Sequence, residues 1–214
     1  MKLLTSFLND LLDFAIPQIC VCCKEPLVRG ETKVCLKCLF LLSPSRKPHG
    51  CFDYREDGHV KAIVLQFKFR QNRSLAYLAG KLMAHRLMQT DLFKGVDCLI
   101  PVPLSALKKC KRGYNQAYWI ALGIQELTGI PVETSVLHRH FEMPWERSQA
   151  SRSPQERRKK NVNKFYAKNT HLIENKCVLI VDDVITSGAT LGNCRNILKG
   201  ISGVVIKIVA FSSA

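Results

Sequence analysis

Apolar positions along this chain fall into two patterns, unbroken runs and helical spacings. Residues 177–181 (Cys-Val-Leu-Ile-Val) form a run with the length and β-branched content of a buried parallel strand. Residues 191–198 and 114–127 instead place apolar side chains at helical spacing, and a Gly and a Pro end the second of these predicted helices. Residues 60–69 fit a helix or a strand.

Predicted strands and helices alternate along the chain. Further strands are expected at residues 97–103, 132–137 and 204–211, and a further helix at residues 75–88, with Gly80 as its weak point. Alternation of this kind gives a mostly parallel sheet with helices on its faces. We therefore expect an α/β fold with a mostly parallel, doubly wound sheet, in which ligands bind beyond the carboxyl ends of the strands.

The composition indicates a globular protein with an anionic partner. Of the 214 residues, 47% are hydrophobic and only 9 are Pro, which argues against a disordered chain. The 32 Lys and Arg residues outnumber the 17 Asp and Glu residues, and the net charge is +15. This charge favours nucleic acid, a polyphosphorylated small molecule, or both as partners. Basic residues are dense over 147–168, although a solvated surface segment has the same pattern.

The N-terminal residues are apolar in part, but they do not have the pattern of a membrane or signal segment. No apolar stretch of the chain approaches the ~20 residues of a membrane span, so we expect no membrane insertion. Asn9 and Asp10 interrupt the first apolar stretch, and no small-residue cleavage site follows it. We therefore expect a cytoplasmic protein whose first residues form a docking helix. Its apolar face would consist of Leu4, Phe7, Leu8, Leu11 and Leu12.

Ten cysteines in a cytosolic chain of this size need an explanation other than disulfides. Two Cys-x-x-Cys pairs, separated by eleven residues, have the spacing of a zinc ribbon: Cys20, Cys23, Cys35 and Cys38. Each pair can place two thiolates on one turn, and two such turns complete a tetrahedron around zinc. Because four cysteine ligands leave no open position, the zinc would be structural. Reduced buried cysteines or a redox pair are the alternatives.

The other cysteines are expected to be bystanders. Cys22 lies next to a predicted ligand, so it should face away from the metal, although it could replace Cys23 with poorer spacing. The remaining five are scattered, and we expect each to be a small buried hydrophobic residue. They are Cys51, Cys98, Cys110, Cys177 and Cys194.

An acidic pair and a loop of small residues follow the strand predicted at residues 177–181. Free backbone N–H groups at a helix start, hydroxyls and a Gly that permits close approach are what a phosphate site needs. Two carboxylates would repel a phosphate, unless they bind neutral hydroxyls or a bridging cation on the same ligand. A sugar phosphate with vicinal hydroxyls meets both demands, whereas an acid-capped turn explains only part of the run. The run consists of Asp182 and Asp183, then Thr186, Ser187, Gly188, Ala189 and Thr190.

A second loop should lie at the same edge of the sheet. It begins near Pro103, at the end of the strand predicted at residues 97–103, and carries four cations and Gly113 just before a helix. Arg112 can bind phosphate in a bidentate manner and the helix start adds its dipole, which favours a pyrophosphate site. A solvated basic loop is the alternative. The other cations are Lys108, Lys109 and Lys111.

Four motifs occur in order behind the cysteine pairs: Pro-Val-Pro-Leu (101–104), Arg-Gly-Tyr-Asn-Gln-Ala (112–117), Arg-Ser-Gln-Ala (147–150) and the acidic run (181–190). The last resembles the phosphoribosyl pyrophosphate (PRPP) motif of type I phosphoribosyltransferases. In this order, the motifs resemble the ComF family of phosphoribosyltransferase-like proteins. The resemblance implies a small N-terminal helix plus zinc-ribbon module over residues 1–45 and a type I phosphoribosyltransferase-like domain over residues 46–214.

The same resemblance implies roles for single residues. Asp182 and Asp183 would bind the ribose 2′- and 3′-hydroxyls of PRPP, and residues 186–190 its 5-phosphate. PRPP would bind together with magnesium, and Arg112 would stabilise the departing pyrophosphate. A hood over the site would span residues 148–161. Its residues near the pyrophosphate would be Gln149 and either Arg157 or Arg158.

Family membership further implies a link to natural transformation, in which such proteins help to handle incoming single-stranded DNA. Three functions therefore stay open. The protein could be an enzyme that transfers a phosphoribosyl group to a nitrogen acceptor. It could bind single-stranded DNA without catalysis, with aromatics such as Tyr114, Tyr118 and Trp119 stacked on bases. It could also be an adaptor that recruits a DNA-uptake helicase through its N-terminal module.

Overall fold

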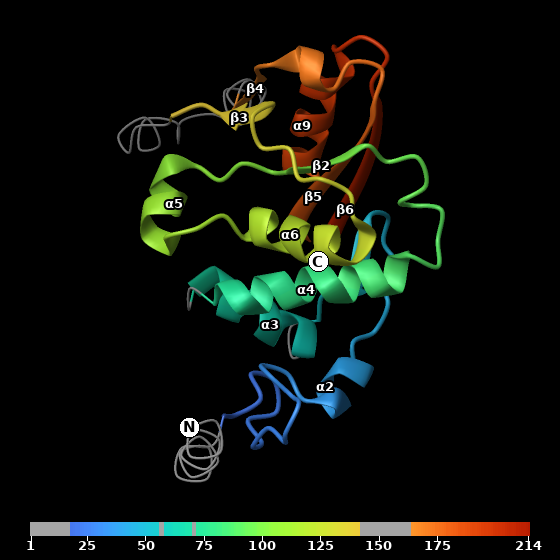
Figure 1. The fold of residues 1–214 in the computed structure, drawn as a ribbon. Coiled ribbons are helices and arrows are strands. Elements are labelled where there is room, and N and C mark those ends of the chain that lie inside the picture. Colours follow the sequence, from blue (N-terminus) through green and yellow to red (C-terminus); the bar gives the residue numbers. More distant parts are fainter. Residues whose placement is uncertain (1–17, 56–57, 70–71, 142–163) are drawn as a thin grey trace, which may run out of the picture.

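The computed structural model describes residues 18–55, 58–69, 72–141 and 164–214. Within them, four strands form one parallel sheet in the order β1 (Gly50–Asp53), β6 (Val205–Ser213), β5 (Cys177–Ile185), β2 (Cys98–Pro101). Figure 1 labels the last three of these strands. The parallel sheet confirms the predicted α/β fold. The docking helix expected in the first residues lies outside the described part of the chain.

Helices cover both faces of the sheet because side chains alternate along its strands. On β5, Leu179 and Val181 face a core shared with α3 (His59–Phe69), α4 (Arg73–Leu87) and α6 (Gln116–Thr128). Val178 and Ile180 face a second core, shared with α9 (Ala189–Lys199). The sheet is thus doubly wound, as expected. All four of these β5 side chains are fully buried, which explains why the sequence there shows an unbroken apolar run.

Residues 60–69, which the sequence left open, form helix α3. The buried residues of α3 are Val60, Ile63, Val64 and Phe67, which lie on one helical face. The predicted strand at residues 132–137 is largely wrong, because only an isolated parallel bridge joins Val132 to Leu99. The strand begins where that prediction ends. It is β3 (Leu137–Arg139), and its antiparallel partner is β4 (Phe165–Ala167).

Helices α4 and α6 touch through their backbones. A Cβ atom added to Gly80 would lie 2.0 Å from the carbonyl oxygen of Ile120, and one added to Gly123 would lie 2.1 Å from that of Tyr77. Gly80 therefore has a packing role that its low helix propensity did not indicate. This glycine lets two helices approach more closely than any side chain would allow.

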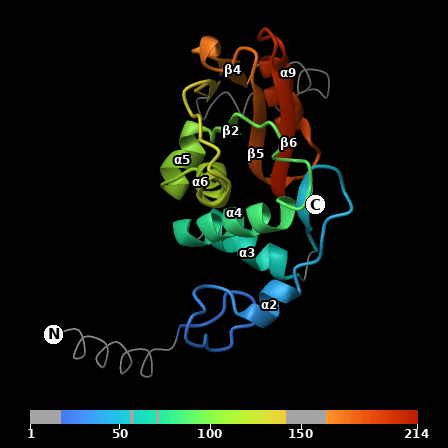
Figure 2. The ribbon, with the colours of Figure 1, turned by 45° about the vertical axis from the view of Figure 1, so that its right-hand side comes forward.

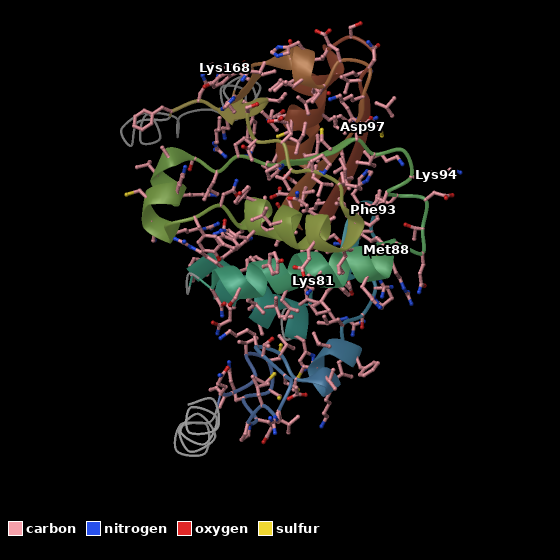
Figure 3. The ribbon with its side chains drawn as sticks, viewed as in Figure 1. Lys81, Met88, Phe93, Lys94, Asp97 and Lys168 are labelled. Atoms are coloured by element: carbon pink, nitrogen blue, oxygen red, sulfur yellow. The ribbon has the colours of Figure 1, made fainter. Side chains whose placement is uncertain are left out.

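The loop between α4 and β2, on which Figure 3 labels Met88, Phe93, Lys94 and Asp97, is held to the sheet by Lys207 of β6. The ammonium of Lys207 donates hydrogen bonds to the carbonyl oxygens of Asp91, Leu92 and Lys94 at 2.8–3.0 Å. One side chain thereby satisfies three backbone acceptors of an irregular segment.

The cysteine-rich residues form a small module that includes α2 (Leu36–Phe40). In Figures 1 and 2 the module lies beyond α3, on the side of the helices away from the sheet. Its buried residues Val34 and Cys38 belong to the same core as α3 and α4, so the module packs on the domain. In the described part of the chain, every helix is too short or too polar to cross a bilayer.

Candidate functional site

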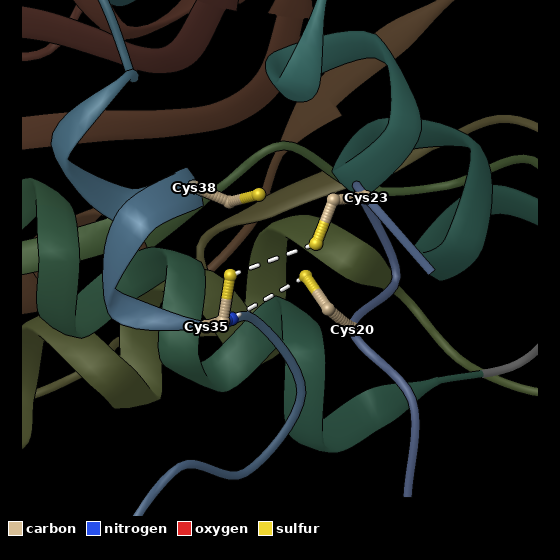
Figure 4. Close-up of side chains that lie close together, drawn as sticks. All are labelled: Cys20, Cys23, Cys35 and Cys38. Atoms are coloured by element: carbon tan, nitrogen blue, oxygen red, sulfur yellow. Dashed lines mark hydrogen bonds between the residues drawn. The ribbon is translucent and has the colours of Figure 1, made fainter. Parts of the chain in front are cut away.

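The structure brings together the four cysteines that the sequence predicted as zinc ligands. The sulfur atoms of Cys20, Cys23, Cys35 and Cys38 all lie within 4.8 Å of one another (Figure 4), and those of Cys23 and Cys35 are 3.7 Å apart. Zinc–sulfur bonds of about 2.3 Å set the sulfur atoms of a tetrahedral site about 3.8 Å apart. The cluster therefore has the size and the donor set of a structural zinc site.

Two backbone N–H groups stabilise the negative charge of one of these sulfur atoms, that of Cys20. The N–H groups of Cys22 and Cys35 both point at the sulfur of Cys20, with N···S distances of 3.4 Å. Burial opposes ionisation, but the N–H groups prevail and lower the pKa of Cys20 to about 6. These N–H groups favour the thiolate, which is the form that binds metals.

Cys22 is excluded from the cluster, as predicted. Its sulfur points to the carbonyl oxygen of His59, 3.7 Å away, and burial raises the pKa of this thiol to about 12. Of the five scattered cysteines, Cys51, Cys98 and Cys194 are buried as expected and Cys177 is partly buried. The prediction is wrong for Cys110, which is exposed on a helix without buried residues.

The acidic pair and the small-residue loop lie at the carboxyl end of β5. This strand continues to Ile185. Asp182 and Asp183 therefore belong to the last four residues of the strand and do not begin a loop. The loop ends at Gly188, whose φ of 72° makes it a left-handed N-cap of α9. Gly188 has no side chain to cap the helix, and the N–H of Ala189 makes only a long hydrogen bond of 3.5 Å to Oγ of Ser187, so an anion could compete for the start of α9.

Asp182 and the loop residues line one small hollow at this end of the sheet. The loop's hydroxyl residues are all exposed at its rim, where a ligand can reach them. The structure therefore groups one carboxylate with every residue predicted for the 5-phosphate. Those residues are Thr186, Ser187, Gly188, Ala189 and Thr190.

The two carboxylates interact strongly. Oδ1 of Asp182 accepts a hydrogen bond from the N–H of Asp183 at 2.8 Å, and Oδ1 of Asp183 accepts one from Val184 at 2.7 Å. Burial, and then the charge of Asp183, raise the pKa of Asp182 to about 8. A ligand that offers hydroxyls or positive charge to this pair would relieve that unfavourable burial.

Lys68, at the end of α3, is a residue of this site that the sequence did not indicate. Its ammonium lies 3.4 Å from Oδ2 of Asp183. The two residues are far apart in the sequence, and a Lys in a largely apolar helix carries no motif that could have identified it.

The basic segment after β2 is a short helix, α5 (Ala106–Arg112), and not the loop that the sequence suggested. Ser105 caps the start of α5 through the N–H of Lys108, and Gly113, with φ of 72°, ends it. Desolvation, and then the charge of Arg112, lower the pKa of Lys108, while the charge of Asp183 opposes this shift. Lys108 is therefore within electrostatic reach of Asp183.

The side chains of residues 114–116 form hydrogen bonds that connect neighbouring elements. The hydroxyl of Tyr114 and the amide nitrogen of Gln116 both donate to the carbonyl oxygen of Phe67, near the end of α3. The side-chain amide of Asn115 donates to the carbonyl oxygen of Val102 at 3.0 Å. The motif thus ties the end of α3 and the end of β2 to the start of α6.

Pro103 and Gly113 do not face the hollow beside Asp182. They line a neighbouring pocket of about 350 Å³, with Tyr118 and Trp119 on its wall. The residues predicted for the hood, Gln149, Arg157 and Arg158, lie outside the described residues. The described residues before and after that segment form the β3–β4 pair, next to which the N–H of His140 donates to the carbonyl oxygen of Lys164 at 2.9 Å.

Residues 124–213 match the phosphoribosyl transferase domain family. The chain is also 29% identical over 145 residues to Competence protein F of Haemophilus influenzae, and the match covers 65% of this chain but only 62% of that relative. Two solved structures are similar at 21% identity, each over 68% of this chain and 30% of the other. One is the allosteric regulatory enzyme of purine biosynthesis (TM-score 0.41), and the other is glutamine PRPP amidotransferase from B. subtilis (TM-score 0.42). The domain match and the curated relative agree with the resemblance that the motifs indicated: the chain is similar to Competence protein F, and its residues 124–213 are similar to the phosphoribosyl transferase domain.

Proposed function

We propose that the carboxyl edge of the sheet binds PRPP with magnesium and transfers its phosphoribosyl group to a nitrogen acceptor. One observation carries the proposal: Asp182 lies in the same hollow as residues 186–190, which include the first residues of α9. Carboxylates for hydroxyls and N–H groups for a phosphate thus stand together, as a sugar phosphate requires.

The cations of the site supply the remaining need of such a ligand. Lys68 contacts Asp183, Lys108 of α5 lies within electrostatic reach of it, and the guanidinium of Arg112 lies 5.8 Å from the ring of Phe69, the residue after Lys68. Three positive groups beside two carboxylates suit a ligand that carries hydroxyls at one end and a diphosphate at the other.

In the proposed reaction the bond between the anomeric carbon and the diphosphate breaks, and a bond to the acceptor nitrogen forms. The two carboxylates orient the ribose through its hydroxyls and stabilise the positive charge that develops on the ring. Arg112 and the neighbouring lysines stabilise the negative charge on the leaving diphosphate. Magnesium would supply further positive charge for the leaving diphosphate if it binds with the substrate.

Calorimetric titration of the zinc-loaded protein with PRPP and magnesium tests the proposal. We expect clear binding by the wild-type protein and none by the Asp182→Asn, Asp183→Asn double variant. Asp91→Asn is the matched control, because Asp91 is exposed in the loop after α4. Equal affinity of the double variant and the wild type would refute the assignment of the acidic pair.

The pocket beside β2 supports a second candidate function, binding of single-stranded DNA. Tyr118 and Trp119 offer ring faces there, and Arg73 and Lys109 offer charge. Affinity for an oligonucleotide should fall steeply with salt, and more steeply in the wild type than in the Lys109→Ala variant. No binding at moderate salt would exclude this function.

We further propose a role in natural competence, possible partners being a DNA-uptake helicase and the incoming strand. The name of the curated relative and the ComF resemblance support it. The test is transformation frequency in cells that carry the Asp182→Asn, Asp183→Asn variant in place of the wild-type protein. A frequency equal to that of the wild type would show that the site is not needed for DNA uptake.

A further inference from the structure

Lys68 forms an ion pair with Asp183, one of the two carboxylates that we propose as ligands of the ribose hydroxyls. Its ammonium is 3.4 Å from Oδ2 of Asp183, and the side chains are only 22% and 15% exposed. The pair is therefore largely removed from solvent, where a charge interaction is screened less than on the surface. The ring of the next residue, Phe69, lies 5.8 Å from the guanidinium of Arg112, so the end of α3 adjoins the α5 cations.

The position of Lys68 is imposed by the residues around it. The carbonyl oxygen of Phe67 accepts hydrogen bonds from the hydroxyl of Tyr114 and from the amide of Gln116. Tyr114 and Gln116 are 4% and 1% exposed, so water does not compete for these bonds. The last turn of α3 is thereby fixed to the start of α6, and Lys68 has a defined place beside the acidic pair.

The ion pair with Asp183 conflicts with the chemistry of the proposed ligand. Asp183 has to accept hydrogen bonds from hydroxyls, yet an ammonium already sits on one of its oxygens. A diphosphate brings several negative charges close to the same carboxylates, and the repulsion must be compensated. An ammonium on a flexible four-carbon stem can satisfy both demands if it moves from the carboxylate to the diphosphate.

We propose that Lys68 is a displaceable counter-ion of this site: it neutralises Asp183 in the empty protein and moves to the diphosphate when a sugar diphosphate binds. This inference rests on the proposed function, since it concerns the same ligand. It also gives Tyr114 and Gln116 a task as positioning residues, which hold the helix end that carries Lys68.

The experiment compares two ligands that differ only in the diphosphate. The zinc-loaded full chain is titrated with PRPP and with ribose 5-phosphate, at the same magnesium concentration, for the wild type and for Lys68→Met. Loss of one charge-assisted contact should weaken PRPP binding about tenfold or more. Ribose 5-phosphate should bind as well as before or more tightly, because its hydroxyls no longer compete with an ammonium for Asp183.

Three further variants separate this role from a structural one. Lys68→Arg keeps the charge and should preserve the preference for PRPP. Tyr114→Phe removes one bond to the Phe67 carbonyl and should reduce the preference less than Lys68→Met does. Lys81→Met is the matched control, because Lys81 forms a 3.0 Å ion pair with Glu126 away from the site, and it should change neither affinity.

The ratio of the two affinities decides the outcome. Equal weakening of both ligands in Lys68→Met, or no change in either, would overturn the inference and leave PRPP binding intact as a proposal. A wild-type protein that binds neither ligand would instead overturn the proposed function, and the inference with it.

Discussion

Replacement of Gly80 by Ala should destabilise this protein, although Ala favours helices. The new Cβ would lie 2.0 Å from the carbonyl oxygen of Ile120, and contacts under 3.0 Å do not occur, so α4 and α6 must separate by about 1 Å. Overpacking of this kind costs about 3 kcal/mol where backbone must move. The higher helix propensity of Ala returns about 1 kcal/mol. We therefore expect a net loss of about 2 kcal/mol in the free energy of unfolding, the balance of these two effects.

The matched control is Gly192→Ala in α9. A Cβ at Gly192 meets nothing within 4 Å, so only the gain in helix propensity remains, about 0.5–1 kcal/mol. Chemical denaturation of both variants and the wild type, followed by circular dichroism, measures the difference. A Gly80→Ala variant as stable as Gly192→Ala would refute the backbone contact between α4 and α6.

Three more predictions concern the metal, the acidic pair and the loop after α4. The purified protein should contain one zinc ion per chain, which mass spectrometry of the metal can measure. The Cys35→Ser variant should lose this zinc and the Cys22→Ser variant should keep it. Equal zinc content in the two variants would contradict the assignment. The pKa of Asp182 is raised from 3.8 to about 8 in the folded protein, so the unfolded chain binds fewer protons between these values and the carboxyl lowers stability as pH rises through them. Asp182→Asn should therefore gain stability relative to the wild type from pH 4 to pH 8, and a pH-independent difference in denaturation midpoints would contradict this. Lys207→Met removes the donor to three carbonyl oxygens and should cost about 1–3 kcal/mol, with faster hydrogen exchange at residues 88–97; unchanged exchange there would show that the ammonium does not hold the loop.

The parts of the fold that the sequence predicted well are those whose pattern is local. Residues 178–181 are fully buried on both faces of the sheet, and helix α6 ends where Gly129 adopts a left-handed conformation. Both features depend on short stretches of chain. The cysteine cluster could also be predicted from the sequence, because the spacing of its ligands follows the geometry of a zinc site.

Helix α5 was missed for a physical reason. None of its residues is buried, so it has no apolar face and no periodicity to detect. Its end signals were present in the sequence, since Ser105 and Gly113 are the cap residues that a short helix needs.

Long-range contacts explain the remaining differences. Lys68 meets Asp183 only because the fold brings α3 beside β5. Tyr114, considered as a platform for bases, is 4% exposed and donates its hydroxyl to the Phe67 carbonyl, which leaves little ring surface for stacking. Tertiary packing decided both cases, and local sequence does not encode it.

Helix α3 has an importance beyond the packing of the core. The carbonyl oxygen of its first residue, His59, accepts a hydrogen bond from the thiol of Cys22. Hydrogen bonds from Tyr114 and Gln116 fix its last turn beside the acidic pair. At 1.5 Å per residue, this helix of 11 residues spans about 16 Å between the cysteine cluster and the sheet edge. The cysteine cluster and the proposed anion site are therefore joined by one helix. Thermodynamic reciprocity applies to such a pair: whatever factor zinc contributes to the affinity for the anion, the anion must contribute to the affinity for zinc.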